Sequence, residues 1–283
     1  MSLHPLIAGL LASLMLAGCA TKPTTVASLK TAYAAGEPAK VPLKANDPVS
    51  MEPAAWGGYW HHLAGRTLTV SSLHDLKLAD KEVVLSFDDG PMPGKTEKIL
   101  ATLDQFGVKG AFMMVGEMAA AHPAIARKVR EDGNTIGSHT YRHADLAGMS
   151  FDKAMAEVVK GENAVSKAVG TDVNFFRFPY LADTRSLRSA IAERDMIVMD
   201  VDVDSKDYFS VKPNAVLQRT MDELHRRGRG IILMHDIHQR TALMLPSLLT
   251  RLEKEGYKVV TVRFGHSSAP SNAIAMADLK MSR

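Results

Sequence analysis

The chain has 283 residues, of which 46% are hydrophobic, so it can bury a substantial core and is not a disordered protein. Its 34 basic and 31 acidic residues give a net charge of +3, a balance that does not favour nucleic acid as a partner. The single cysteine excludes an internal disulfide and a zinc site built from cysteines.

The N-terminal segment has the pattern of an export signal. An apolar run covers residues 5–17, which is short for a transmembrane helix but typical of the apolar region of a signal peptide. The sequence Leu-Ala-Gly-Cys at residues 16–19 resembles the lipobox of bacterial lipoproteins, although residues 1–4 contain no Lys or Arg. The resemblance implies a signal peptide that ends at Cys19 and a lipid on that cysteine. The alternative is a buried thiol on a core helix.

The lipobox also implies a location. The mature protein would be anchored by lipid in the bacterial cell envelope and face the periplasm, on the outer membrane if the host has two membranes. Residues 20–79 are predicted to be a tether and N-terminal extension, since Thr, Ala, Pro, Lys and Ser dominate up to about residue 60 without a hydrophobic period. Residues 80–264 form the predicted globular domain, and residues 265–283 a flexible C-terminal tail.

From about residue 80, short apolar runs alternate with stretches of helical period. The predicted strands are residues 83–87, 111–115, 135–138, 174–178, 197–203, 231–234 and 257–262. The predicted helices are residues 96–106, 123–131, 151–169, 184–194, 213–227 and 243–255. Continuous apolar strands separated by amphipathic helices indicate a parallel sheet covered by helices, either a closed barrel or an open doubly wound sheet.

Both folds place their chemistry at the carboxyl ends of the strands, and titratable residues follow most of the predicted strands. These residues are Asp88 and Asp89, His139 and His143, Arg177, Asp204 and Asp207, and His235 and Asp236. A lone Asp in such a place is usually a helix cap, but a whole rim of titratable groups indicates an active site.

Two of these positions have the spacing of metal ligands. His139 and His143 are four residues apart, so in a helical turn both rings would lie on one face and could bind one ion. Two histidines and one carboxylate leave coordination positions open for water and substrate, which is typical of a catalytic site. Successive side chains leaving a strand point in different directions, so one of Asp88 and Asp89 can bind metal while the other acts as a base.

Five segments, in order, resemble the motifs of the polysaccharide deacetylases, which are carbohydrate esterase family four with a NodB-like domain. The segments are Phe87-Asp88-Asp89-Gly90-Pro91, His139-Thr140-Tyr141-Arg142-His143, Arg177-Phe178-Pro179-Tyr180, Asp204-Ser205-Lys206-Asp207-Tyr208 and Leu233-Met234-His235. The resemblance covers residues from about 80 to 264. Tyr208 stands where a Trp is usual and Leu181 where a Gly is usual, and both departures concern substrate specificity.

The resemblance implies a distorted seven-stranded (β/α) barrel and assigns a metal site. Asp89, His139 and His143 would hold one divalent ion, usually zinc, with cobalt or nickel as alternatives. Asp88 would be the general base, positioned by Arg177.

The resemblance also implies roles for the remaining motif residues. His235 would be the general acid, with its pKa tuned by Asp207. The backbone N–H of Tyr180 would form the oxyanion hole together with the metal. Leu233 and Tyr208 would form the small apolar pocket for the acetyl methyl group.

The predicted function is therefore metal-dependent removal of N-acetyl groups from an amino-sugar polysaccharide such as peptidoglycan, a chitin-like polymer or an exopolysaccharide. We expect a monomer that meets the membrane only through its lipid anchor. The alternatives are an O-acetyl polysaccharide esterase, a sugar-binding module without catalysis, and a non-haem iron oxygenase, which shares the two-histidine, one-carboxylate metal set. An oxygenase would have no use for Asp88 or His235, and a binding module would be expected to lack a ligand or the base.

Overall fold

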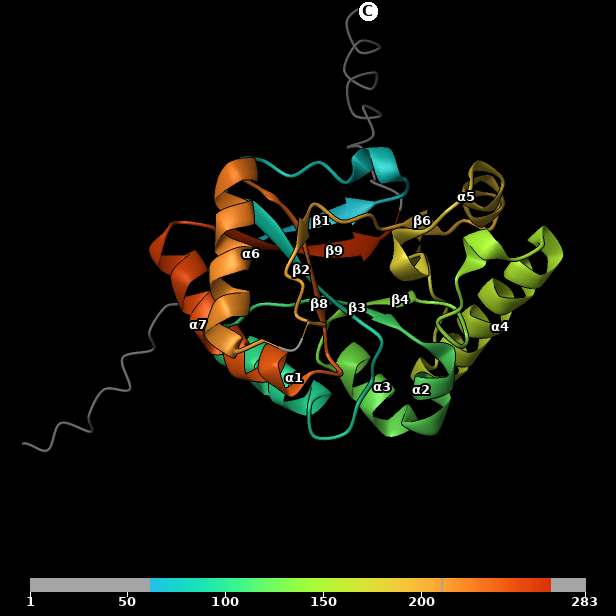
Figure 1. Ribbon diagram of the computed structural model, residues 1–283, viewed down its shortest axis with the longest axis horizontal. Helices are drawn as coiled ribbons and strands as arrows, with labels where there is room; N and C mark the ends of the chain where they lie inside the picture. The colour runs from blue at the N-terminus through green and yellow to red at the C-terminus, as the bar shows by residue number, and fades with distance from the viewer. Residues whose placement is uncertain (1–61, 210, 266–283) are drawn as a thin grey trace, which may run out of the picture. The chain divides into compact units, whose positions relative to one another are not determined.

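The computed structural model describes residues 62–209 and 211–265 (Figure 1). The predicted signal peptide with Cys19, the tether up to residue 61 and the C-terminal tail from residue 266 lie outside the described residues. None of the described helices is long and apolar enough to cross a membrane.

The centre of the fold is a parallel sheet. Its strands are β1 (Ala64–Val70), β2 (Glu82–Asp88), β3 (Ala111–Met114), β4 (Thr135–Ser138), β5 (Phe175–Phe176), β6 (Ile197–Val198), β7 (Val203–Asp204), β8 (Gly230–His235) and β9 (Lys258–Phe264). They are ordered β1-β9-β2-β3-β4-β5-β6, with β8 also paired to β2 and β7 to β8. All these pairs are parallel, as predicted.

The sheet curls into a distorted barrel because one extended segment joins two parts of it. The predicted strand over residues 197–203 is in fact two short strands, since β6 pairs with β5 whereas β7 pairs with β8. Between them the backbone changes partner: the N–H of Met199 donates to Phe176, and that of Asp202 to Ile231. This change of partner interrupts the strand and closes the sheet, which decides between the two predicted folds in favour of the barrel.

Helices surround the strands on three sides, while β1 and β9 lie along the remaining side (Figure 1). The helices are α1 (Thr96–Gln105), α2 (Gly116–Ala121), α3 (Pro123–Glu131), α4 (Phe151–Val169), α5 (Arg185–Ala192), α6 (Pro213–Arg227) and α7 (Gln239–Lys254). Short 3-10 turns are η1 (Leu73–Asp75), η2 (Leu146–Gly148) and η3 (Pro179–Leu181). The prediction missed α2 and placed the start of α7 at Leu243 instead of Gln239.

The strand β1 was also not predicted. It pairs in parallel with β9 at an edge of the sheet, and most of its residues are exposed or half-buried. An edge strand with little burial lacks the continuous apolar run that marks a central strand. Part of the segment assigned to the N-terminal extension thus joins the sheet.

The central strand β2 buries both of its faces. Val83, Leu85 and Phe87 belong to the large cluster shared with the helices, whereas Val84 belongs to a second cluster whose buried members all come from strands or their immediate ends. Because side chains alternate along a strand, residues 84, 86 and 88 share the inward face. Asp88, at the end of this row, therefore points into the barrel at its carboxyl rim.

Candidate active site

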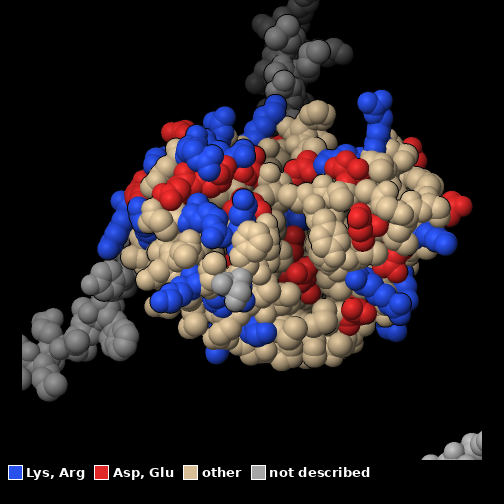
Figure 2. All heavy atoms as spheres, viewed as in Figure 1, with Lys and Arg blue, Asp and Glu red and all other residues tan. Residues whose placement is uncertain are grey.

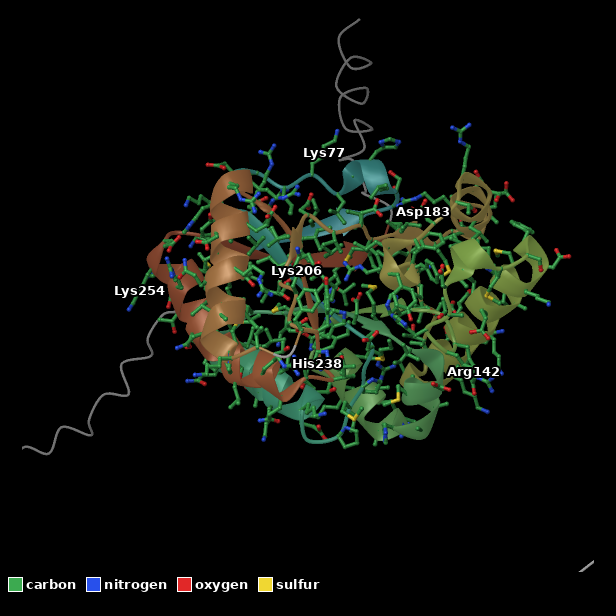
Figure 3. The ribbon with its side chains drawn as sticks, in the orientation of Figure 1. Lys77, Arg142, Asp183, Lys206, His238 and Lys254 are labelled. Carbon is green, nitrogen blue, oxygen red and sulfur yellow. The ribbon has the colours of Figure 1, made fainter. Side chains whose placement is uncertain are left out.

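A cavity of about 400 Å³ opens at the carboxyl ends of the strands. It is lined by Asp88, Asp89, His139, His143 and His235 among others. Figure 2 shows it as a hollow with acidic atoms at its bottom. In the same view Lys206 and His238 lie on one side of this region, and Asp183 and Arg142 on the other (Figure 3).

The register of the sheet places two of the predicted residues side by side. Asp88 ends β2 and is paired in the parallel ladder with His235, which ends β8. The two strands thus deliver a carboxylate and an imidazole at the same level of the rim.

Asp88 is held by a buried arginine. Arg177 Nη1 donates to Asp88 Oδ1 at 2.6 Å and to Ser86 Oγ at 2.9 Å, while Nε donates to the carbonyl of Met199 at 2.9 Å. Both side chains are almost fully buried, so each charge compensates the other in a site where an unpaired charge would be costly. The arginine occupies Oδ1 and leaves Oδ2 of Asp88 facing His139, with Nε2 at 3.7 Å.

Asp89 turns back toward the histidines. Its φ of 78° is left-handed, so the chain bends sharply after β2. Asp89 Oδ1 then lies 3.4 Å from His143 Nε2 and 3.7 Å from His139 Nε2. The three candidate ligand atoms all lie within 4.8 Å of one another.

This set of donors fits a divalent metal ion. Asp89 Oδ1 is buried and has no hydrogen-bond partner among the described residues. A buried carboxylate oxygen left without a donor normally requires an explanation, and a cation between the three side chains would supply one.

His139 adopts the tautomer in which Nε2 is unprotonated and can bind a metal ion. Its Nδ1 lies 2.8 Å from the carbonyl oxygen of Arg177, which can only accept, so Nδ1 carries the proton. Burial lowers the pKa of His139 and favours the neutral ring, despite the nearby charges of Asp88 and Asp89. A fixed second nitrogen is typical of metal-binding histidines.

The two histidines converge, but not on a helical turn as the spacing suggested. They lie in a tight turn after β4 in which Thr140 and His143 have left-handed φ values of 64° and 56°. The turn brings the two ring centres to 4.8 Å. The reason given for the convergence was therefore wrong, although the rings do meet.

His235 forms a buried pair with Asp207. Its Nδ1 lies 2.6 Å from Asp207 Oδ1, and its backbone N–H donates to Asp207 Oδ2 at 2.8 Å. The hydroxyl of Thr241 also donates to Asp207. Burial lowers the pKa of His235, but the hydrogen bond and charge of Asp207 outweigh it and raise the pKa to about 9. The imidazole is therefore charged at neutral pH.

The remaining predicted site residues line the same cavity. The Tyr180 ring packs edge-on against His143 with ring centres 4.6 Å apart, and the Tyr208 ring packs against His235 at 5.6 Å. The Tyr208 hydroxyl donates to Asp204 Oδ2 at 2.9 Å. Leu233, which is buried, lies on the cavity wall.

Asp236, a buried residue directly after β8, received no predicted role. Thr96 Oγ1 donates to Asp236 Oδ2 at 2.6 Å, and a Cβ on Gly90 would lie only 2.0 Å from that oxygen. Burial raises the pKa of Asp236 to about 7. Asp236 thus supports the turn that carries Asp89 and Gly90 from beneath. Its position directly after His235 was the available signal, since adjacent side chains at a strand end diverge.

Known proteins with related sequences include several deacetylases. Residues 75–198 match the family model described as polysaccharide deacetylase. A chitin deacetylase of Colletotrichum lindemuthianum is 30% identical over 202 residues, which cover 67% of this chain and 81% of that protein. The peptidoglycan-N-acetylglucosamine deacetylase of Listeria monocytogenes is 30% identical over 183 residues, covering 65% of this chain. The match spans only 38% of that relative's length.

Solved structures with a similar fold include the same group of proteins. A peptidoglycan deacetylase of Bdellovibrio bacteriovorus superimposes with a TM-score of 0.63 at 31% identity, covering 75% of this chain and 59% of that structure. The parallel barrel, the family model and the extensive match to the fungal relative agree with the motifs found in the sequence. The chain therefore belongs to the polysaccharide deacetylase family.

Proposed function

We propose that the protein is a metal-dependent hydrolase that removes N-acetyl groups from an amino-sugar polysaccharide of the cell envelope. The observation that carries the proposal is the meeting, in one cavity, of a metal-ligand set, a carboxylate held by Arg177 and a charged imidazole. Two relatives, a peptidoglycan-N-acetylglucosamine deacetylase and a chitin deacetylase, support N-acetylglucosamine polymers as the substrate class.

Asp89, His139 and His143 would hold the metal. We propose zinc, because two imidazoles and one carboxylate are typical of catalytic zinc sites, while cobalt and nickel accept the same donors. Such an ion polarises a carbonyl and increases the acidity of bound water. The chain's own contribution is to fix His139 through the Arg177 carbonyl and to turn Asp89 into the cavity.

Asp88 would take the proton of the attacking water. Arg177 occupies Oδ1, so Oδ2 is the oxygen that remains available as a base. The attack produces an oxyanion, and the backbone N–H of Tyr180 would donate to it. Tyr180 has a left-handed φ of 59°, and its N–H has no hydrogen-bond acceptor among the described residues.

His235 would protonate the leaving amine. An amine departs only with a proton, and a histidine with a pKa of about 9 holds that proton at neutral pH. Its Nδ1 is bound to Asp207, so Nε2 is the nitrogen that would donate. Leu233 and Tyr208 would surround the acetyl methyl group.

The N-terminal sequence supports an attachment to the envelope. Under this proposal residues 1–19 act as a signal peptide, Cys19 carries lipid, and the following residues tether a monomeric catalytic domain. A single acyl chain binds membranes only weakly, whereas a multiply acylated cysteine gives a stable anchor.

The test uses the purified, zinc-loaded protein on three polymers. Peptidoglycan, N-acetylglucosamine oligomers and acetylxylan are incubated separately, and mass spectrometry detects the loss of acetyl groups. We expect loss from an N-acetylated polymer. Release from acetylxylan alone would instead support an O-acetyl esterase, and release from none of the three would contradict the hydrolase proposal.

A further inference from the structure

Large apolar side chains gather at the mouth of the cavity. Of the eight exposed large hydrophobic side chains in the described residues, four lie here: Tyr180 at 68% exposure, Leu181 at 46%, Tyr208 at 44% and Phe209 at 52%. We call these four residues the apolar rim. Three of them line the cavity, and Phe209 packs against Tyr208 with ring centres 4.8 Å apart.

The apolar rim has two sides. Tyr180 and Leu181 come from the segment after β5, and Tyr208 and Phe209 from the segment after β7. In Figure 3 Asp183 and Lys206, close in sequence to these two pairs, lie apart on the two sides of the hollow that Figure 2 shows. A chain passing over the acidic bottom of the hollow would therefore meet apolar groups on both sides.

Leu181 is the member of the rim that the fold itself does not explain. Its φ of 55° is left-handed, directly after Tyr180 at 59°. This conformation is unfavourable for a side chain with a Cβ, and glycine adopts it without strain. Leucine has no polar group to stabilise the turn, and this leucine is not buried in the core. Neither local conformation nor packing favours leucine here, and its half-exposed side chain lines the cavity, where it is available to contact a ligand.

The position of Leu181 indicates which part of a ligand it meets. Tyr180 packs on the candidate ligand His143, and the next residue, Leu181, lines the same cavity with its side chain half-exposed. The acetyl group must reach the bottom, where Asp88 and Asp89 lie. The groups that remain at the mouth are the linked sugar units, whose C–H faces pack well on apolar side chains.

We propose that Leu181 is a specificity-determining residue that contacts the sugar unit next to the acetylated one, so that this side chain contributes to the binding of linked sugars but not of a single N-acetylated sugar. This inference rests on the proposed function and assigns one contact within it. It assigns the unfavourable backbone conformation of Leu181 to substrate binding.

The experiment compares Leu181→Gly with the wild type on N-acetylglucosamine and on its linear tetramer. Removing the side chain should lower kcat/KM on the tetramer roughly three- to tenfold, mainly through KM, because a half-exposed leucine loses its contact with the substrate. The value for the single sugar should stay within twofold. The Tm should be unchanged or rise by roughly 2–4 °C, because glycine relieves the strain.

The matched control is Asp195→Gly. Asp195 is another exposed non-glycine residue with a left-handed φ, at 56°, and it does not line the cavity. Its replacement relieves the same kind of strain and should leave the kinetics on both substrates unchanged. Equal tetramer kinetics for Leu181→Gly and the wild type would overturn the proposal. Equal losses on the single sugar and the tetramer would do so too, because Leu181 would then act on the reacting unit.

A binding measurement tests the role of Leu181 independently of the proposed function. Calorimetry measures the Kd of the tetramer for Asp88→Asn and for Asp88→Asn combined with Leu181→Gly, so that turnover is not needed. A three- to tenfold weaker Kd in the double variant supports the role of Leu181 even if the wild type released acetyl groups only from another polymer. An unchanged Kd, or no binding of the tetramer to Asp88→Asn, overturns it whatever the activity.

Discussion

The pair formed by His235 and Asp207 makes a quantitative prediction for Asp207→Asn. The substitution keeps the size and most of the hydrogen bonding of residue 207 but removes its negative charge. Burial alone lowers the pKa of His235, and Asp207 is the main group that raises it to about 9. Without that charge we expect the pKa to fall to its ordinary value of 6.5 or below.

The loss of activity then follows from the protonated fraction of His235. At pH 8 a pKa of about 9 leaves roughly 90% of the imidazole protonated, whereas a pKa of 6.5 leaves roughly 3%. An amide reaction that needs this proton should therefore slow by roughly 30-fold at pH 8. At pH 6 the two fractions differ by less than about twofold, so the loss there should be small.

The assay is the pH dependence of kcat/KM on an N-acetylglucosamine oligomer between pH 5 and 10. Metal content is measured beside each rate. Asp202→Asn is the control. Asp202 accepts a hydrogen bond from the backbone N–H of Ile231 at 2.9 Å, so it lies beside the first residues of β8, at the opposite end of that strand from His235. The control should keep the wild-type pH profile. A loss in Asp207→Asn that is equally large at pH 6 and pH 8 would show that Asp207 does not act through the protonation of His235.

Three further predictions concern the cavity, and a fourth concerns the N-terminal segment. Stability from the raised pKa of His235 is complete below about pH 6.5 and lost as the pH rises through about 9, so the Tm gap between wild type and Asp207→Asn should narrow from pH 6 to pH 10. His235→Ala should lose roughly 10²–10⁴-fold on an acetamide sugar but far less on an aryl acetate, whose leaving group needs no proton; equal losses would exclude a general acid. Asp89→Ala should lose metal and activity together by elemental analysis, whereas Asp88→Asn should keep its metal and still lose roughly 10²–10⁴-fold in rate; a metal-free Asp88→Asn would reverse the assignment. Cys19→Ala should move the protein from the membrane fraction to the soluble fraction, and identical fractionation would contradict lipidation.

The elements predicted best are those whose ends carry their own signals. The helix α4 agrees with the prediction to the residue, and Gly170 ends it in a left-handed conformation with φ of 75°. The helix α6 agrees equally well, with Pro213 in its first turn and Gly228 after its last. Local chemistry determines these ends, so a single sequence is enough to find them.

The prediction errors occur where residues that are distant in the sequence determine the local structure. Nothing in residues 197–203 indicates that the first part pairs with β5 and the second with β8, because the change of partner depends on the curvature of the barrel. The strand β1 depends on β9, which lies almost two hundred residues later in the chain. Likewise the spacing of His139 and His143 suggested a helix, whereas left-handed residues form a turn. Sequence spacing singled out the two candidate ligands but did not predict the backbone that brings them together.

The ends of two strands, β2 and β8, each carry two consecutive titratable residues at the centre of the site, and the two residues of each pair have different roles. Asp88 and His235 complete the parallel ladder and both line the cavity at one level. The next residue on β2, Asp89, is turned back into the cavity by its left-handed backbone, whereas the next residue on β8, Asp236, is buried beneath that turn. Glycine at position 90 is required for this arrangement, since any side chain there would collide with Asp236. The carboxylate that faces the candidate metal thus depends on a second carboxylate that faces away from it, and the two adjacent pairs, Asp-Asp and His-Asp, are parts of one support.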